Sequence, residues 1–364
     1  MVEQLIVLRM RKLTILLAAL ALLAGCAAPI PDDAYVVGFY NVENLFDAEH
    51  DRGKSDQAFL PDGENNWTQE KYEKKVSNMA RVIQAMSGKN GRWHSVLGLA
   101  EVENDRVLEA LVADPQIAEA GYEFVHFEGP DVRGIDCALL YRPAQFKVQE
   151  TRTLPYDFNT KGGIVFEKTP EEQRAFKTRD VLFVRGLLDG TPFAIYVCHW
   201  PSRTGNKGSD LRCRAAEIVY DDIQAVEKRH PGIRVVVMGD MNDNPEDECM
   251  SVWLHGRETI EEMQEGDLFS PFLRMHKDGF GSEEYHGEWN IFDCIFVNGA
   301  LAAPTDGGLR IQKSDAFHYG YIFDPPFLTQ QEGRYAGTPK RTLSGGQFMD
   351  GYSDHYPTYI ILSK

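Results

Sequence analysis

The sequence lacks an excess of positive charge. Its 364 residues carry 38 lysines and arginines against 55 aspartates and glutamates, a formal net charge of −17. Proteins that bind nucleic acid nonspecifically usually present a basic face, so this balance gives no support for tight nonspecific DNA binding. It does not exclude a nuclease, because a local basic groove can lie on an acidic body.

Cysteine is scarce, and its spacing matches no zinc site. Beyond Cys26 there are Cys137, Cys198, Cys213, Cys249 and Cys294. Cys137, Cys198 and Cys294 stand in apolar, strand-like runs, so we expect them to be small buried hydrophobic residues. An exported protein could form one disulfide from this set, but the sequence favours no pair.

Several motifs are also missing. There is no G-x-S-x-G turn and no phosphate-binding P-loop, so nothing points to a covalent serine intermediate or to a P-loop nucleotidase. No internal repeat or long low-complexity segment is present. The acidic run at 47–56 resembles a calcium loop, but its glycine falls one place late and no closing glutamate follows. We expect a solvated acidic loop there.

The N-terminus holds an apolar run typical of exported proteins, "MRKLTILLAALALLAGC" at residues 10–26. A basic start and a short apolar stretch indicate a secretory signal rather than a spanning helix. The ending "LAGC" resembles a bacterial lipobox, which implies cleavage before Cys26 and lipid on its thiol. A plain signal peptide with a chance cysteine is the alternative. We expect Met10 to be the true start.

This interpretation divides the chain into a signal peptide at 1–25, a tether at 26–33 and a single domain at 34–364. Removal of residues 1–25 takes away three bases and one acid, which leaves a net charge of −19. An acidic body of this kind would be held at the membrane by its acyl chains rather than by charge. The expected location is extracytoplasmic, on a membrane of the bacterial cell envelope.

Strand signals outnumber helix signals along the domain. Thr68–Met86 has the apolar spacing of an amphipathic helix that ends at Ser87-Gly88, and residues 209–230 form a second one with Ser209 as its cap. Many strands with few helices predict two packed sheets with helices on the outer faces. Residues 302–350 are rich in glycine, proline and aromatics, as in long loops that line a site.

Polar residues stand at or near the ends of several apolar runs. They are Asn41, Glu101, His199, Asp240, Asn242, Asp293, Asp354 and His355. Taken singly, most have an ordinary interpretation as turn formers or hydrogen-bonded surface groups. Asp293 is harder to explain, because a carboxylate inside an apolar strand is unfavourable unless it is paired. Eight such residues in one chain indicate a common site.

The segment "VVVMGDMNDNP" at 235–245 combines both features. Its valines predict a buried strand, and Gly239 is expected to let the backbone turn close to the site. If the strand continues, Asp240 and Asn242 project from the same side and face one phosphate. Residues 243–245 are expected to be turn formers.

Several motifs in one order resemble the endonuclease/exonuclease/phosphatase superfamily, which includes deoxyribonuclease I, abasic-site endonucleases, sphingomyelinases and inositol-polyphosphate 5-phosphatases. The motifs are "NVEN", "LAEVEN", "RGIDCALLYR", "CHWPSR", "GDMND", "FDCIF" and "SDHYP", from residue 41 to 357. The resemblance implies a deoxyribonuclease I-like α/β fold. This is a four-layered sandwich of two mixed or antiparallel sheets flanked by helices. It also implies a divalent-metal phosphoesterase.

The same resemblance implies a metal site and its ligands. Glu101 would be the main metal carboxylate, with Asn41 beside it and Asp354 in contact through water. Hard oxygen ligands of this kind suit Mg²⁺, with Mn²⁺ as a second possibility.

The resemblance also implies the catalytic roles. Asp240 would orient or deprotonate the attacking water, and Asn242 would donate a hydrogen bond to the phosphate or to that water. Asp293 would pair with His355, and His199 would be a second imidazole facing the phosphate. The choice of base between Asp240 and His355 stays open.

Basic and aromatic residues supply candidates for substrate binding. Arg133, near the phosphate site of the resemblance, is as well explained as a surface arginine, and Arg203 is a weaker candidate. The late segment mixes rings and cations at Tyr319, Tyr321, Phe323, Tyr335, Lys340 and Arg341. Bases stack on such rings, but we favour packing of the aromatics onto the body.

Hydrolysis of a phosphodiester needs an activated water, charge relief at the phosphoryl oxygens and a protonated leaving group, and the residues above supply all three. We therefore expect a metal-dependent phosphoesterase, most simply an extracytoplasmic nuclease or phosphodiesterase. A phosphatase, or a sphingomyelinase or inositol-phosphate type of hydrolase, is the alternative, and an inactive binding lipoprotein is a third. The expected partners are a phosphate-ester substrate and the membrane; no obligate protein partner is indicated.

Overall fold

The computed structural model describes residues 30–364 apart from 32, 159–163, 165, 167 and 204–207. The expected signal peptide, Cys26 and most of the tether therefore lie outside the described residues. Among the residues that are described, no helix is long and apolar enough to cross a membrane.

The first sheet contains seven strands and is mixed. Its order is β14 (Arg310–Ile311), β18 (Thr358–Ser363), β1 (Tyr35–Leu45), β2 (Val96–Val102), β4 (Asp136–Tyr141) and β3 (Glu123–His126), with β15 (Gly320–Ile322) also paired to β18. β1 and β2 are parallel, whereas the other pairs are antiparallel. The two parallel strands therefore lie in the middle of the sheet.

The second sheet also has seven strands. Its order is β5 (Phe146–Leu154), β6 (Val181–Leu188), β7 (Thr191–His199), β8 (Arg234–Asp240), β13 (Asp293–Asn298), β10 (Leu268–Phe269) and β9 (Gly256–Arg257). β7 and β8 are parallel. They occupy the middle of this sheet, as β1 and β2 do in the first.

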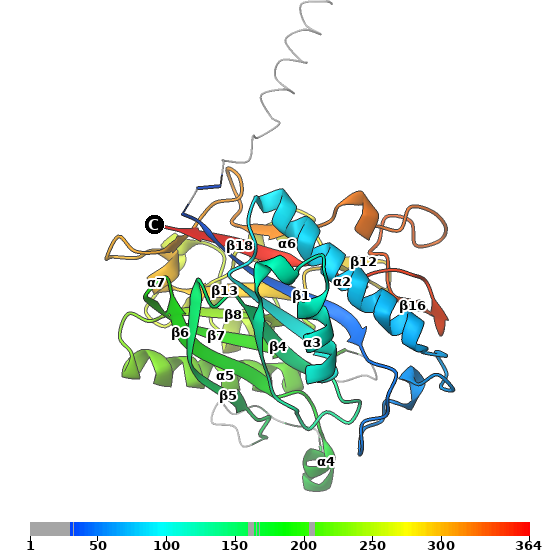
Figure 1. Cartoon of the computed structure of the whole chain (residues 1–364). Coiled ribbons are helices and arrows are strands. Elements are labelled where there is room, and N and C mark those ends of the chain that lie inside the picture. The colour runs from blue at the N-terminus through cyan, green and yellow to red at the C-terminus, as the bar shows by residue number, and fades with distance from the viewer. Residues whose placement is uncertain (1–29, 32, 159–163, 165, 167, 204–207) are drawn as a thin grey trace, which may run out of the picture.

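The two sheets pack face to face, with helices on the outside (Figure 1). Alternate residues of β1 show the layering: Val37 and Phe39 belong to the core shared with the second sheet, whereas Val36 and Tyr40 pack with α2 (Gln69–Asn90). α3 (Asp105–Ala113) lies with α2, and α5 (Ser209–Arg229) covers the second sheet. The expected four-layered sandwich is confirmed.

Two expected helix ends are wrong. α2 runs through Ser87-Gly88 and ends at Asn90, because Gly91 adopts the left-handed conformation (φ +66°) and its amide donates to the Gly88 carbonyl. α5 begins at Ser209 itself, with Gly208 as the N-cap residue, so Ser209 is not the cap.

The remaining elements are short. They are α4 (Pro170–Ala175), α6 (Leu273–Lys277), α7 (Gly299–Ala302), the hairpin β11 (Glu283–Tyr285) with β12 (Glu288–Asn290), and the hairpin β16 (Leu343–Ser344) with β17 (Gln347–Phe348). Residues 302–350 are therefore not one long loop, since they contain the strands β14 to β17. Isolated turns of 3-10 or π helix complete the chain at Gln57–Phe59, Ala118–Ala120, Cys249–Trp253, Ile260–Glu262 and Pro326–Leu328.

The acidic run at 47–56 is not a solvated loop throughout. Asp47 and Asp56 are buried. The Asp47 carboxylate accepts a hydrogen bond from Arg106 Nε at 2.7 Å, and Asp56 pairs with His50. These partners satisfy the buried charges, which composition alone did not suggest.

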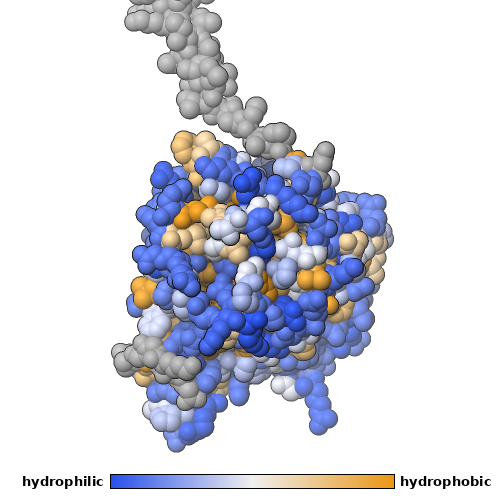
Figure 2. Space-filling model, turned by 90° about the vertical axis from the view of Figure 1, so that its left-hand side faces the viewer, coloured by the Kyte–Doolittle hydropathy of each residue, from blue (hydrophilic) through white to orange (hydrophobic). Residues whose placement is uncertain are grey.

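The five cysteines that the structure describes are all free and buried. Cys137, Cys198 and Cys294 lie within β4, β7 and β13, as expected for small core residues. On the surface, the face seen in Figure 2 is largely hydrophilic, with apolar side chains scattered in small groups. That face offers no large apolar area for a partner.

Candidate active site

Three polar residues form a row across the second sheet. The pairing of β7, β8 and β13 sets Asp240 beside His199 on one side and beside Asp293 on the other. Directly paired residues project from the same face of a sheet, so strand register alone gathers these three side chains. His199 Nε2 lies 3.6 Å from Asp240 Oδ2.

Asn242 joins this row by a route other than the expected one. β8 ends at Asp240, and Asn242 stands in a left-handed conformation (φ +54°), so the strand does not continue. The backbone N–H of Asn242 donates to Asp240 Oδ1 at 3.0 Å, and the side-chain Nδ2 of Asn242 donates to the Trp200 carbonyl at 3.0 Å. The turn therefore folds back onto the carboxylate that precedes it.

Gly239 does not make a turn. It is a regular residue of β8, paired with Cys294. A Cβ atom there would lie 2.2 Å from the Cys198 carbonyl oxygen, so the glycine is needed for close approach of β7.

The first sheet contributes Glu101 from an irregular position. The register between β2 and β4 shifts between Ala100 and Val102, which leaves Glu101 unpaired and left-handed (φ +67°). Such bulges turn a side chain toward a site. Glu101 Oε2 accepts a hydrogen bond from the backbone N–H of Asn44 at 2.9 Å, and Glu101 Oε1 lies 3.8 Å from His199 Nε2.

Asn41, expected beside the metal, lies next to Asp240 and makes hydrogen bonds within the protein. Its Nδ2 donates to Asp240 Oδ2 at 2.9 Å, and its Oδ1 accepts the Glu43 amide at 3.0 Å. Since both polar atoms of the side chain are used within the protein, Asn41 holds Asp240 in place.

His355 is held from behind by a buried pair of groups. Asp293 Oδ2 lies 2.8 Å from His355 Nδ1 and accepts the Ser282 hydroxyl at 2.6 Å. Ser353 fixes the backbone, because its hydroxyl donates to the Asn41 carbonyl and accepts the His355 amide. His355 Nε2 is thereby left facing the cavity.

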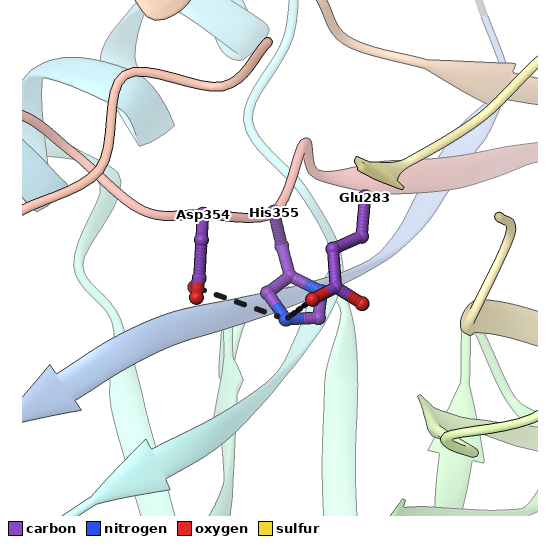
Figure 3. Close-up of side chains that lie close together, drawn as sticks. All are labelled: Glu283, Asp354 and His355. Atoms are coloured by element: carbon purple, nitrogen blue, oxygen red, sulfur yellow. Dashed lines mark ion pairs between the residues drawn. The ribbon is translucent and has the colours of Figure 1, made fainter. Parts of the chain in front are cut away.

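Glu283 completes this side of the site, and sequence reasoning missed it (Figure 3). It comes from the β11–β12 hairpin, and its Oε1 lies 3.9 Å from His355 Nε2. Asp354 Oδ1 lies 3.8 Å from the same nitrogen, and atoms of Glu283, Asp354 and His355 all fall within 4.8 Å of one another. The glycine of His286-Gly287, at the turn of the hairpin, was the available signal.

Burial and charge set the protonation of the acids. Burial, with the negative charge of Asp293, raises the pKa of Asp240 to about 6 against the opposing effect of His355. Burial, with Asp354, raises the pKa of Glu283 to about 8.

The two imidazoles differ in charge. Burial, followed by the positive charges of Arg179 and Arg133, lowers the pKa of His199 well below its usual value. Burial would also lower the pKa of His355, but Asp293 and Glu283 together raise it well above that value. His199 is therefore a neutral imidazole and His355 a charged one.

These groups surround one cavity of about 1230 Å³. Six of the eight strand-end candidates line it: Glu101, His199, Asp240, Asn242, Asp354 and His355. Asn41 and Asp293 stand behind the lining, each in contact with a residue that belongs to it.

The arginines around the cavity differ in how free they are. Arg133 lines the cavity and is half-exposed, and its one ion pair within the described part of the chain is with Asp131, at 3.7 Å. Arg203 also lines the cavity, but its guanidinium is bound to Asp243 and Asp247. These ion pairs stabilise the turn after β8 and leave the guanidinium less available to a substrate.

Arg179 was not expected from the sequence. It is buried, lines the cavity and donates to the Trp200 carbonyl at 2.7 Å. The Trp200 contact is made by Nη2, and Nη1 of Arg179 lies 3.3 Å from Asp131 Oδ2.

The late aromatics divide into two groups. Tyr319 packs edge-on to Phe269, Tyr321 stacks on Tyr359 and Phe323 is buried, so packing onto the body is confirmed for these three. It is wrong for Tyr335, which is 51% exposed and lines the cavity.

The late cations also divide. Arg341 lines the cavity and pairs with Glu43 and Asp354. Lys340 is turned away, with its Nζ on the Asp350 carbonyl.

Comparison with known proteins agrees with this geometry. Residues 36–364 match the sequence profile described as the Endonuclease/Exonuclease/phosphatase family. The chain belongs to that family. It is thus a phosphoric ester hydrolase, and enzymes of the endonuclease/exonuclease/phosphatase family generally depend on a divalent metal. A comparison with curated proteins found no match.

Several solved structures share the fold. D. rerio TDP2 complexed with a single-strand DNA product is 15% identical, with a TM-score of 0.52 over 92% of this chain and 100% of that one. The human Nocturnin catalytic domain with bound sulfate is 15% identical, with a TM-score of 0.51 over 92% and 96%. A Bacteroides thetaiotaomicron endonuclease/exonuclease/phosphatase family protein is 15% identical, with a TM-score of 0.50 over 90% and 97%.

Proposed function

We propose that this chain is a Mg²⁺-dependent phosphodiesterase that uses an activated water directly, most simply a nuclease acting outside the cytoplasm. The observation that carries the proposal is the convergence of Glu101, His199, Asp240 and His355 on one cavity, from β2, β7, β8 and the segment before β18. Carboxylates can activate the attacking water while imidazoles stabilise the negative charge of the phosphate, so this combination suits hydrolysis of a phosphate ester.

The residues divide the work by their environments. Asp240, held by Asn41 and the Asn242 amide, orients the water and accepts its proton. His355, charged and fixed by Asp293, offers Nε2–H to a phosphoryl oxygen or to the leaving oxygen. His199, neutral, donates Nε2–H to an oxygen of the same phosphate. No covalent intermediate on the protein is needed.

The donor set fits a divalent cation. Glu101 keeps Oε1 directed toward the cavity, and Asp354 adds a second carboxylate next to Glu283. Carboxylate oxygens favour Mg²⁺ and also accept Mn²⁺. A bound cation would supply positive charge to the phosphoryl oxygens.

A substrate panel tests the function. Purified protein with Mg²⁺ or Mn²⁺ is offered plasmid DNA, RNA, sphingomyelin, inositol phosphates and a phosphomonoester. Hydrolysis of nucleic acid supports the proposal, and exclusive hydrolysis of one of the last three replaces it with the phosphatase or phospholipase alternative. If none is hydrolysed, the chain is better described as a binding protein.

The envelope location is a separate proposal, and it rests on the "LAGC" sequence before Cys26. The intact protein should partition with membranes, and mass spectrometry should find acyl chains on Cys26. The Cys26→Ala variant should be released in soluble form. Membrane association that survives this change would contradict the anchor.

A further inference from the structure

A second feature of the cavity lies outside the catalytic groups: a loop whose tip reaches it. Thr329 and Pro339 pair as an antiparallel bridge that closes the loop. The Gln330 amide donates to the Thr338 carbonyl, and the Gly337 amide donates to the Gln330 carbonyl, both at 2.8 Å. The tip therefore projects as a small closed turn.

The tip presents a ring and a cation together. Arg334 and Tyr335 line the cavity, and the Arg334 guanidinium lies 5.5 Å from the centroid of the Tyr335 ring. Neither side chain has a carboxylate partner among the described residues. An exposed tyrosine and an unpaired arginine on a cavity wall are available to a ligand.

The chain that follows the tip is fixed to the end of β1. The Thr342 amide donates to Glu43 Oε2 at 2.6 Å, while the fully buried Lys75 donates to the Thr342 hydroxyl and to the Tyr352 carbonyl. Arg341 adds its pairs to Glu43 and Asp354. The tip is thus held at a set place beside the catalytic groups.

Cations also stand on the opposite flank. Arg133 lines the cavity and precedes β4, whereas the tip loop lies between β15 and β18. In the first sheet, β1 and β2 lie between β4 and β18 and carry Asn41 and Glu101. Lys177 also lines the cavity, from the segment before β6 of the second sheet. A substrate that lies across the ends of β1 and β2 would therefore meet positive charge on both sides of the phosphate that reacts.

We propose that Arg334 and Tyr335 form a subsite for a nucleotide adjacent to the scissile phosphate. The Tyr335 ring stacks on the base and the Arg334 guanidinium pairs with the neighbouring phosphate, so the preferred substrate is a single strand of nucleic acid. The inference rests on the phosphodiesterase function proposed above. A lipid or sugar phosphate offers no planar group for this ring.

The experiment compares two octamers of equal charge, oligothymidylate and an abasic deoxyribose-phosphate octamer, cleaved by the full-length protein with Mg²⁺. Tyr335→Ala should lower kcat/KM for oligothymidylate by roughly 5- to 150-fold, the range of one base–aromatic stack, and leave the abasic octamer unchanged. Tyr335→Phe should retain the wild-type value. Phe317→Ala, an exposed aromatic outside the cavity lining, is the matched control.

The arginine is tested in parallel. Arg334→Ala should weaken cleavage of both octamers, because both carry the phosphate, whereas Arg310→Ala, at the exposed position of β14, should weaken neither. An equal effect of Tyr335→Ala on both octamers, or no effect on either, overturns the subsite. Wild-type protein that hydrolyses bis(p-nitrophenyl) phosphate but neither octamer leaves the phosphodiesterase standing and overturns the subsite. Hydrolysis of none of the three overturns both proposals.

Discussion

His355 Nδ1 and Asp293 Oδ2 lie 2.8 Å apart in a part of the core where Asp293 is completely buried. This contact fixes the ring and maintains its charge. Asp293→Asn should therefore lower kcat by roughly 10²-fold or more, the contribution typical of one positioned acid–base group. Steady-state kinetics on an oligonucleotide measure the effect.

The hairpin carboxylate gives the matched comparison. Glu283 Oε1 lies 3.9 Å from the other ring nitrogen of His355, beyond hydrogen-bond distance. Glu283→Gln should consequently reduce kcat less than Asp293→Asn does. The opposite order would show that Asp293 does not hold the catalytic ring.

Glu101→Gln should weaken metal binding and abolish activity. The substitution keeps the shape of the side chain and its acceptor for the Asn44 amide, but removes the negative charge that a hard cation needs. Calorimetric titration with Mn²⁺ should show an affinity lower by at least about tenfold. Glu109→Gln, on the exposed side of α3, is the control, and equal affinities in the two variants would place the ion elsewhere.

Gly239→Ala should destabilise the fold. The added methyl group would meet the Cys198 carbonyl within the β7–β8 pair, and overpacking of this kind reduces the free energy of unfolding by about 1–3 kcal/mol or more. Gly88→Ala is the control, since a Cβ there meets nothing within 4 Å and the residue lies inside α2. It should be neutral or stabilising by about 0.5–1 kcal/mol. Urea unfolding distinguishes the two; comparable effects would contradict the close approach.

Acid should destabilise the protein through His94. This residue is fully buried, neither ring nitrogen has a hydrogen-bond partner among the described residues, and burial lowers the pKa of His94 to about 3. The unfolded chain takes up a proton near its ordinary pKa of about 6.5 while the folded chain does not, so stability falls as the pH drops below that value.

The size of the effect follows from one proton. Between pH 7 and pH 5, His94 should account for roughly 2 kcal/mol of the loss in the free energy of unfolding. The loss should be smaller by this amount in His94→Leu. Urea unfolding at the two pH values measures it, and an identical pH dependence in wild type and His94→Leu would refute the assignment.

The sequence predicted the layers and most of the strand ends, because apolar runs interrupted by acids and amides mark the places where rigid strands meet a site. Asp293 stood out for the same reason, as a carboxylate inside an apolar strand. Register then did what no pattern along the chain could show: it set His199, Asp240 and Asp293 side by side.

Other parts depend on contacts between distant residues. The position of Glu101 comes from a bulge, and the contacts of Asn41 with Asp240 join residues of different sheets. Glu283 and Arg179 lie in segments with weak local patterns and reach the site through the fold. Gly239 looked like a turn former, whereas its close approach to Cys198 is visible only once β7 lies beside it.

The most direct test of the central claim is cleavage of a fluorescent single-stranded octamer by the purified protein with Mg²⁺, with EDTA, and with EDTA followed by excess Mg²⁺. Wild-type protein should cleave the strand only when Mg²⁺ is available and should recover on its return, while Glu101→Gln should stay inactive throughout. Cleavage that persists in EDTA, or in Glu101→Gln at the wild-type rate, would contradict a metal-dependent phosphodiesterase centred on Glu101.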